Sequence, residues 1–321
     1  MRACTLRTSE GRLRTPWRLL VAAAFFMFVS LGVSAAAVAV GLAPAPGSPG
    51  VDPFAVVGPH ILNGTALALA VVVAARFLDR RRYAEFGLSV DRRWWRDLLV
   101  GLGLGFGLIA AAYLVGVAVG VYEPTLSPAA PDGYTVLRAF ALVSVFTCVV
   151  GLYEELLFRG YLLPNVADGL TALLDDRHAI LGAVGLSGIG FGAVHGLNPG
   201  MTLLGVGTIA VAGFLLGLGY VLTGRLALPI GVHVTWNFAQ FVFGLPVSGI
   251  DLGIRFLRTD RVGSPLLHGG LVGPEGGVLG LAAALVGCVL VAVYAAWTGD
   301  GAKLAAVGRT RPGGGTDQPP R

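Results

Sequence analysis

The stretch HAILGAVGLSGIGFGAVHGLNPGMTLLGVGTIAVAGFLLGLGYVLTG, residues 178–224, contains no Asp, Glu, Lys or Arg. A helix needs roughly 20 apolar residues to cross the ~30 Å hydrocarbon core of a bilayer, so this stretch is too long for a single crossing. Asn198, Pro199 and Gly200 divide it, because proline cannot continue a helix and Asn and Gly favour turns. The stretch therefore predicts two membrane-spanning helices joined by a short turn.

The rest of the chain has the same apolar character. Of its 321 residues, 55% are hydrophobic and 13% are charged, and the mean hydropathy is +0.76. Soluble domains usually carry about 25% charged residues, so a soluble globular protein is excluded. The long apolar runs predict an all-α, polytopic bundle of about eight transmembrane helices, at residues 19–43, 61–78, 98–121, 138–158, 179–197, 202–223, 226–244 and 278–297.

Basic residues are distributed unevenly along the chain. They gather before the first helix, between the second and third, and in the C-terminal tail, at positions 2, 7, 12, 14, 18, 76, 80, 81, 82, 92, 93, 96, 303, 309, 311 and 321. The connections on the opposite side of the membrane, residues 44–60 and 121–137, contain no Lys or Arg. The 245–277 connection on that same side is the exception, because it contains Arg255, Arg258 and Arg261. By the positive-inside rule, we predict a multi-pass integral cell membrane protein with both termini cytoplasmic. The net charge of +5 then reflects topology and not nucleic-acid binding.

Three segments make up the predicted organisation. Residues 1–137 hold the first three helices and a basic cytoplasmic loop, 138–244 form the core, and 245–321 contain an external loop, the last helix and a disordered cytoplasmic tail. The first helix exceeds the usual signal-peptide core of about 7–15 residues, so we expect it to stay uncleaved. Cys4, Cys148 and Cys288 are far apart and predict neither a disulfide framework nor a thiolate metal site.

Few ionisable side chains fall at membrane depth, where each costs about 2.5–3.5 kcal/mol on insertion scales and is a candidate for function. They are Glu154, Glu155, Arg159, His195 and His233, joined by the amide of Asn237. Glu155 and Arg159 are four residues apart with the acid first, which is the favoured order for an ion pair. Glu154 points about 100° away around the helix, so the two acids are predicted to have different partners.

Each of these features also has a purely structural explanation. The glutamates and Arg159 could snorkel at a helix end, His195 could bond a free carbonyl at the end of its helix, and His233 with Asn237 could join two helices by hydrogen bonds. Together, however, they place an acid, two imidazoles and an amide on three helices of an otherwise bare membrane domain. That combination is harder to explain by packing.

Two hydrolytic chemistries fit this set of side chains. In one, Glu154 and His195 act on a water as general base, while His233 and Asn237 stabilise the oxyanion of a tetrahedral intermediate. In the other, Glu154, His195 and His233 ligate a divalent metal such as zinc, which lowers the pKa of a bound water to ~7. The residue types are the same in both cases, so the sequence leaves the choice open.

The same residues, in this order, resemble the CAAX-protease-like and bacteriocin-processing (CPBP, abortive-infection-type) family of intramembrane proteases. The family pattern is EExxxR, then FxxxH, then HxxxN, and the chain has EELLFR at 154–159, FGAVH at 191–195 and HVTWN at 233–237. The resemblance implies an intramembrane cavity in which Glu154 is the catalytic acid–base residue with His195. It also implies that His233 and Asn237 stabilise the oxyanion or contribute to a metal site, with support from Glu155, Arg159 and Phe191.

The resemblance predicts an endopeptidase acting on a membrane-associated protein or peptide. It does not identify the substrate or require it to be prenylated. A non-proteolytic membrane scaffold or immunity protein of the same fold is the first alternative, and a proton-coupled transporter is the second. A transporter of this kind would be expected to show internal symmetry, which the sequence lacks. Pairs such as Gly192–Gly196 and Gly213–Gly217 permit close helix contacts, without identifying an oligomeric state.

The predicted topology leaves one geometric conflict. Glu154 falls near the inner end of its helix and His195 near the outer end of the next, although both must reach one water. We therefore expect the helix that carries His195 to begin near Leu186. Residues 165–185 would then be interfacial or re-entrant, and the turn after His195 would lie inside the protein.

Overall fold

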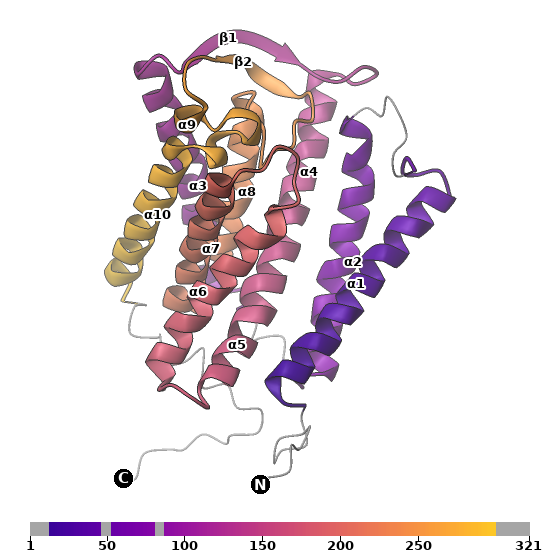
Figure 1. The fold of residues 1–321 in the computed structure, drawn as a ribbon, viewed down its shortest axis with the longest axis vertical. Coiled ribbons are helices and arrows are strands. Elements are labelled where there is room, and N and C mark those ends of the chain that lie inside the picture. The colour runs from indigo at the N-terminus through magenta and orange to yellow at the C-terminus, as the bar shows by residue number, and fades with distance from the viewer. Residues whose placement is uncertain (1–12, 46–52, 81–86, 300–321) are drawn as a thin grey trace.

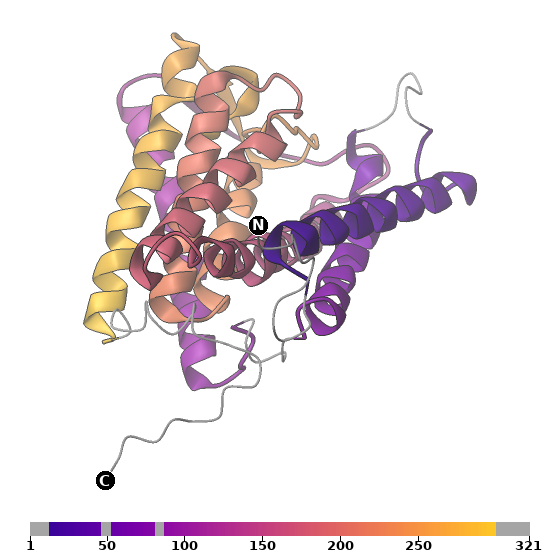
Figure 2. The ribbon, with the colours of Figure 1, turned by 60° about the horizontal axis from the view of Figure 1, so that its bottom comes forward.

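The computed structural model describes residues 13–45, 53–80 and 87–299. The predictions for the arginines at positions 2, 7, 12, 81 and 82 and for the C-terminal tail lie outside these ranges. The main helices are α1 (Thr15–Ala39), α2 (Val57–Phe77), α3 (Arg92–Ala118), α4 (Val136–Glu155), α5 (Leu163–Leu170), α6 (Asp176–His195), α7 (Leu203–Thr223), α8 (Ala227–Val242) and α10 (Val278–Trp297). Most of them run roughly from top to bottom in Figure 1, with α1 and α2 to one side, and Figure 2 shows that α1 lies at a steep angle to α10.

Seven helices of the described residues are long and apolar enough to cross a membrane, which confirms an all-α polytopic bundle. They correspond to the predicted spans except for 226–244. There α8 has 16 residues, and its side chains are mostly buried by its neighbours. The start of α1 and the end of α10 lie at the same end of the bundle, called the lower end below (Figure 1).

The first membrane-crossing helix of the core is longer than predicted, and this removes the geometric conflict. α4 continues through a π-helical segment, Leu156–Leu162, into α5, so that Val136–Leu170 form one apolar run of 35 residues. The expected helix start near Leu186 is wrong: Asp175 caps α6 by accepting a hydrogen bond from the backbone N–H of His178 at 3.1 Å. At 1.5 Å per residue, Glu154 and His195 then lie at similar heights, each roughly 20–30 Å above the lower end.

The predicted burial of the turn after His195 is also wrong. Leu197 in this turn is 93% exposed. The turn is held by local hydrogen bonds instead, because the Asn198 N–H donates to the carbonyl of His195 at 3.0 Å and the Met201 N–H to that of Asn198 at 3.2 Å. Irregular backbone therefore lies at the surface here, with its polar groups paired to one another.

Glycines bring the backbones of two helix pairs into contact. A Cβ on Gly231 of α8 would lie 2.5 Å from the carbonyl oxygen of Leu98 in α3, and one on Gly192 of α6 would lie 2.5 Å from that of Val206 in α7. Gly213 of α7 faces Gly188 of α6, where an added Cβ would lie 2.9 Å from Cα. The close contacts predicted for Gly192 and Gly213 therefore occur within the chain, as small residues allow in membrane helices.

We predict that Gly192→Ala destabilises the protein. Its Cβ would meet rigid backbone, and overpacking of this kind usually costs about 1–3 kcal/mol. Gly185→Ala in the same helix is the matched control, because an added Cβ there meets nothing within 4 Å and alanine favours helix by roughly 0.5–1 kcal/mol over glycine. Thermal unfolding in detergent should give a lower midpoint for Gly192→Ala only, and equal midpoints would contradict the packing argument.

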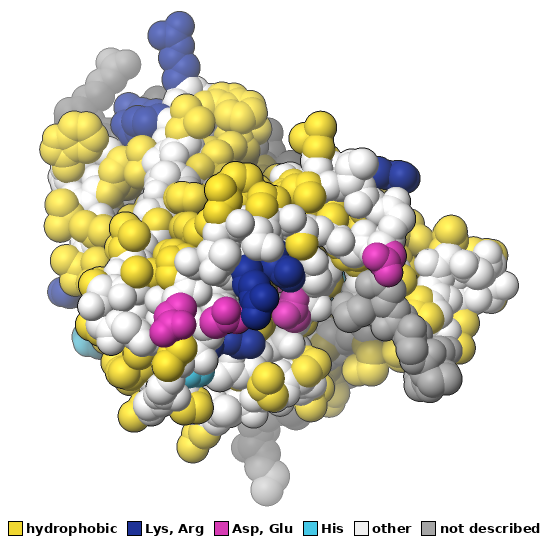
Figure 3. Space-filling view, turned by 90° about the horizontal axis from the view of Figure 1, so that it is seen from above, with side chains coloured by type: hydrophobic (Ala, Val, Ile, Leu, Met, Phe, Trp, Pro, Cys, Tyr) yellow, Lys and Arg dark blue, Asp and Glu magenta, His cyan; other side chains and the backbone are white. Residues whose placement is uncertain are grey.

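A small antiparallel sheet closes the upper end, where the sequence predicted loops. β1 (Tyr122–Ala129) pairs with β2 (Arg255–Arg261), in register from Tyr122 opposite Arg261. The charged side chains of this end gather near the middle of the face (Figure 3). Arg258 pairs with Asp260 at 3.2 Å, and Arg261 donates to the carbonyl of Gly270. These local partners explain how basic residues are accommodated in the 245–277 connection, the exception to the charge pattern.

Two buried ionic clusters near the lower end were missed at the sequence level. Asp97 of α3 is fully buried and accepts hydrogen bonds from Arg225, before α8, at 2.5 Å and from the Tyr294 hydroxyl of α10 at 2.6 Å. Arg18 of α1 donates to Asp168 of α5 at 2.5 Å and lies 3.4 Å from Asp79. Both clusters join helices that are distant in sequence, so spacing along the chain could not reveal them.

Candidate active site

A cavity of about 300 Å³ lies between α2, α4, α6, α7 and α8. Its walls are largely apolar, with side chains such as Phe146, Ile209 and Leu216. The polar groups facing it belong to His60, Tyr153, Glu154, His195, Asn198, His233, Asn237, Ser248 and Glu275. A mostly apolar cavity with a few convergent polar groups is the usual form of a small binding or active site.

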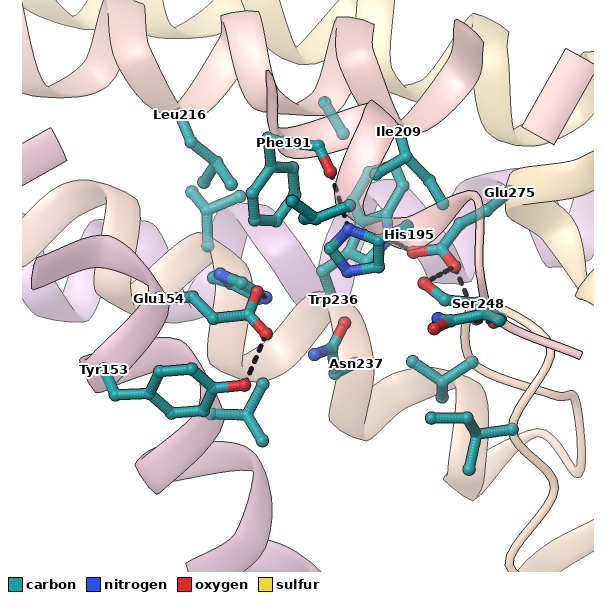
Figure 4. A pocket seen from close by; sticks show the side chains of 18 of the residues that line it. Tyr153, Glu154, Phe191, His195, Ile209, Leu216, Trp236, Asn237, Ser248 and Glu275 are labelled. Atoms are coloured by element: carbon teal, nitrogen blue, oxygen red, sulfur yellow. Dashed lines mark hydrogen bonds and ion pairs between the residues drawn. The ribbon is translucent and has the colours of Figure 1, made fainter. Parts of the chain in front are cut away.

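Glu154 reaches this cavity from the end of α4, immediately before the π-helical segment (Figure 4). Its side chain is 12% exposed, and its Oε1 accepts a hydrogen bond from the Tyr153 hydroxyl at 2.9 Å. The other oxygen, Oε2, is buried without a hydrogen-bond partner among the described residues and lies 3.7 Å from Nε2 of His233. One carboxylate oxygen is therefore held in place while the other remains able to accept a proton.

Glu155 points away from Glu154 into a fully buried ionic network. The predicted ion pair with Arg159 is present, at 2.7 Å between Nη1 and Oε1. The same Oε1 accepts a hydrogen bond from Nδ1 of His233 at 2.8 Å, and Arg159 also donates to the carbonyl of Gly213 at 2.8 Å. Arg159 is 0% exposed, so the snorkelling explanation does not apply. The network holds the imidazole of His233 through Nδ1 and joins the first and third sequence motifs.

His195 ends α6, and Phe191 stands one turn before it. The Nδ1–H of His195 donates to the carbonyl of Phe191 at 2.7 Å, which is the structural role considered for it. This bond leaves Nε2 as an acceptor, and the ring faces the cavity near Asn237 (Figure 4). The Phe191 ring lies 4.7 Å from the His195 ring and 5.7 Å from that of His233, with the guanidinium of Arg159 4.6 Å from its centroid.

Asn237 lies one turn after His233 on α8 and is 8% exposed. It lines the cavity with Glu154, His195 and His233. The structure thus brings all four predicted catalytic side chains to one cavity, which Phe191 also lines, while Glu155 and Arg159 lie outside it. The interhelical hydrogen bond considered for His233 is present, and its partner is Glu155 of α4.

Sequence reasoning missed five polar residues of the cavity: His60, Tyr153, Asn198, Ser248 and Glu275. His60 stands near the start of α2, where a histidine carries no special signal. Glu275 was hidden in an apolar, glycine-rich loop, although a single acid in such a stretch is the same signal that identified Glu154. Tyr153, Asn198 and Ser248 are ordinary residues for helix ends and turns, so their types and spacing carried no signal.

A metal ion would need several of these side chains as ligands at one point. In the described ranges, no group of three or more His, Cys, Asp or Glu side chains is placed to hold one. Nδ1 of both His195 and His233 is hydrogen-bonded, to the Phe191 carbonyl and to Glu155, which leaves Nε2 of each ring as the nitrogen that could bind a metal. As they stand, the side chains of Glu154, His195 and His233 are not grouped closely enough to hold a metal ion together.

Comparison with known proteins identifies the core of the chain. Residues 136–239 match a family model described as type II CAAX prenyl endopeptidase Rce1-like. The match contains the three motifs and the parts of α4, α6, α7 and α8 that surround the cavity. Searches of curated proteins and of solved structures gave no match. The resemblance found in the sequence is therefore confirmed over residues 136–239, and the core of this multi-pass integral membrane protein is similar to the CAAX-protease-like family.

Proposed function

We propose that this protein is an intramembrane endopeptidase that hydrolyses a peptide bond of a membrane-associated protein or peptide. The family match supports endopeptidase activity at the level of the family. The observation that carries the proposal is the position of Glu154, whose side chain lines a cavity shared with His195, His233 and Asn237 and whose buried Oε2 is without a hydrogen-bond partner among the described residues.

Glu154 and His195 act on the attacking water in this proposal. The unpaired Oε2 of Glu154 can take a proton from water, and the hydrogen bond from Tyr153 to Oε1 holds the carboxylate in the required direction. Nε2 of His195 is an acceptor on the same cavity, since its Nδ1–H donates to the Phe191 carbonyl. Glu154 then returns the proton to the leaving amine, as general acid–base catalysis requires.

His233 and Asn237 stabilise the oxyanion. Glu155 holds His233 through Nδ1, so a doubly protonated His233 would donate from Nε2 toward the cavity while its charge is balanced by that carboxylate. The amide of Asn237 supplies a second donor from the next turn of α8. Preorganised donors of this kind act strongly in a site from which water is largely excluded.

Orientation and domain organisation follow the charge pattern. We propose that the lower end, with the start of α1 and the end of α10, faces the cytoplasm. Arg14, Arg18, Arg76 and Arg80 are at helix ends on that side. Residues 138–244 act as the catalytic core in this proposal, with the preceding and following segments completing the bundle.

The proposal is tested with purified protein in detergent and a panel of peptides derived from membrane proteins. We expect wild type to cleave at least one peptide and His195→Ala to lose that activity. Metal content is measured on the same samples. Stoichiometric metal in wild type that is lost in His195→Ala would replace the glutamate–histidine mechanism by a metal-assisted one.

A non-proteolytic scaffold or immunity protein of the same fold is the competing function. It predicts that folded wild type cleaves no peptide and that wild type and His195→Ala behave alike in every assay. A melting transition for both proteins in the same detergent would show that inactivity is not a result of misfolding. Such a result would overturn the enzymatic proposal and leave the unpaired Glu154 oxygen without a catalytic explanation.

A further inference from the structure

Glu275 is a second acidic side chain on the cavity, outside the three motifs. It lies in a short 3₁₀ turn, Pro274–Gly276, just before α10, and is 4% exposed. The donors that the structure pairs with its two oxygens are all neutral. A buried carboxylate stabilised only by neutral donors depends on holding each of them in place.

The first oxygen, Oε1, is bonded to α8. It accepts a hydrogen bond from the indole N–H of Trp236 at 2.8 Å and a longer one from the amide of Gln240 at 3.4 Å. Trp236 lines the cavity and directly precedes Asn237. Through this bond, Glu275 sets the position of the large indole ring at one side of the cavity.

The second oxygen, Oε2, holds the turn after α8. Both the backbone N–H and the hydroxyl of Ser248 donate to it, each at 2.7 Å. The backbone of Ser248 has φ +48°, which is uncommon for a residue other than glycine and persists where the surroundings enforce it. The neighbouring Val247 and Ile250 form a bridge to each other and line the cavity. Glu275 thus holds a strained turn that forms a wall of the cavity.

The same turn is bonded to the segment that follows His195. The amide of Asn198 donates to the carbonyl of Ser248 at 3.0 Å, and the backbone N–H of Asn198 donates to the carbonyl of His195 at 3.0 Å. Glu275, Ser248 and Asn198 are therefore joined by a continuous chain of hydrogen bonds. Glu275 and Ser248 lie on the side of the cavity opposite Glu154 (Figure 4).

We infer that Glu275 is a positioning residue for substrate binding, holding Trp236 and the Ser248 turn as the wall against which a peptide lies. This inference rests on the proposed peptidase function. Its effect is separable from the hydrolytic step, because Glu155 holds the ring of His233 and the Phe191 carbonyl holds the ring of His195, through bonds that do not involve Glu275. Tyr153 likewise bonds Glu154 on the other side of the cavity.

The test compares Glu275→Gln with wild type in steady-state cleavage of one peptide. Glutamine offers one acceptor oxygen, so its NH₂ must face either the Trp236 indole N–H or the Ser248 N–H, and two donors then meet. We expect KM to rise about tenfold while kcat stays within about threefold, the pattern of lost binding without lost chemistry. Ser248→Ala, which removes one donor and leaves the acid, should raise KM in the same direction but less.

Glu123→Gln is the matched control. Glu123 is an exposed acid on β1 at the upper end of the bundle, and its substitution should change neither constant. A fall in kcat for Glu275→Gln as large as the rise in KM would overturn the inference, as would unchanged constants in a folded variant.

Hydrogen exchange on the same variants separates this inference from the peptidase proposal. Exchange at residues 245–250 and 196–202 should be faster in Glu275→Gln than in wild type, with residues 203–223 unchanged, because only the segments bonded through Glu275 are released. If wild type cleaves no peptide, the proposed peptidase function is wrong. Unchanged exchange in both segments would then independently overturn the positioning role.

Discussion

Replacing Glu154 by glutamine is expected to lower kcat for peptide cleavage by about 10²–10⁴, the usual contribution of a positioned general acid–base group. The amide can still accept the hydrogen bond that the Tyr153 hydroxyl gives to Oε1 of Glu154, at 2.9 Å, so the local fold should survive. What is lost is the oxygen that takes the proton from water. Single-turnover cleavage of one peptide measures the effect without interference from product release.

Tyr153→Phe is the matched control for this prediction. It removes the hydrogen bond to Oε1 but leaves the Glu154 carboxylate and its unpaired oxygen. We therefore expect a reduction in kcat of less than about tenfold, since only the orientation of a functional base is disturbed. Equal losses in Tyr153→Phe and Glu154→Gln would show that the two residues act as one structural unit, and would contradict a separate chemical role for Glu154.

Arg159→Met is expected to cause the largest loss of stability, about 3–5 kcal/mol, because breaking a buried ion pair leaves an uncompensated charge. Glu155 would keep His233 as a partner but lose the 2.7 Å bond to Arg159, and the carbonyl of Gly213 would lose its donor. The measurement is the free energy of unfolding, or the shift of the thermal midpoint, in detergent. Arg177→Met, at an exposed position of α6, should stay within about 0.5 kcal/mol of wild type.

The double variant Glu155→Gln with Arg159→Met tests the cause. It removes both charges and leaves an amide that can still accept from His233, so part of the lost stability should return. The alternative outcome is a double variant whose loss of stability equals the sum of the losses in the two single variants. The cost would then lie not in the charge but in lost packing around Phe191 and Phe158, whose rings lie 4.6 and 5.8 Å from the guanidinium.

Much of the site could be predicted because it depends on residue types that are rare in a membrane. Glu154, His195, His233 and Asn237 stand out against apolar neighbours, and the i,i+4 rule correctly paired Glu155 with Arg159. Structure adds that His233 also bonds to Glu155. That contact joins residues 78 positions apart, and no spacing along one helix predicts it.

The errors in the fold have two physical origins, one for the helix ends and one for the sheet. Hydropathy shows where a helix can cross, but it does not show where a helix ends when apolar sequence continues past a charge. The π-helical segment after Glu155 keeps the backbone bonded through the motif, so the run extends to Leu170 and not to residue 158. The β1–β2 sheet was missed because its two strands come from distant connections and are stabilised by pairing with each other.

The contact between α3 and α8 has a consequence for biosynthesis. Gly231 of α8 fits directly against the backbone of Leu98 in α3, yet Val119 to Leu226 must be made between the two helices. At about 5–20 residues per second, α3 waits on the order of ten seconds for the helix that covers its glycine face. During that interval the nascent chain needs lipid, the insertion machinery or a chaperone against α3, so this helix is open to misassembly while the ribosome is still translating.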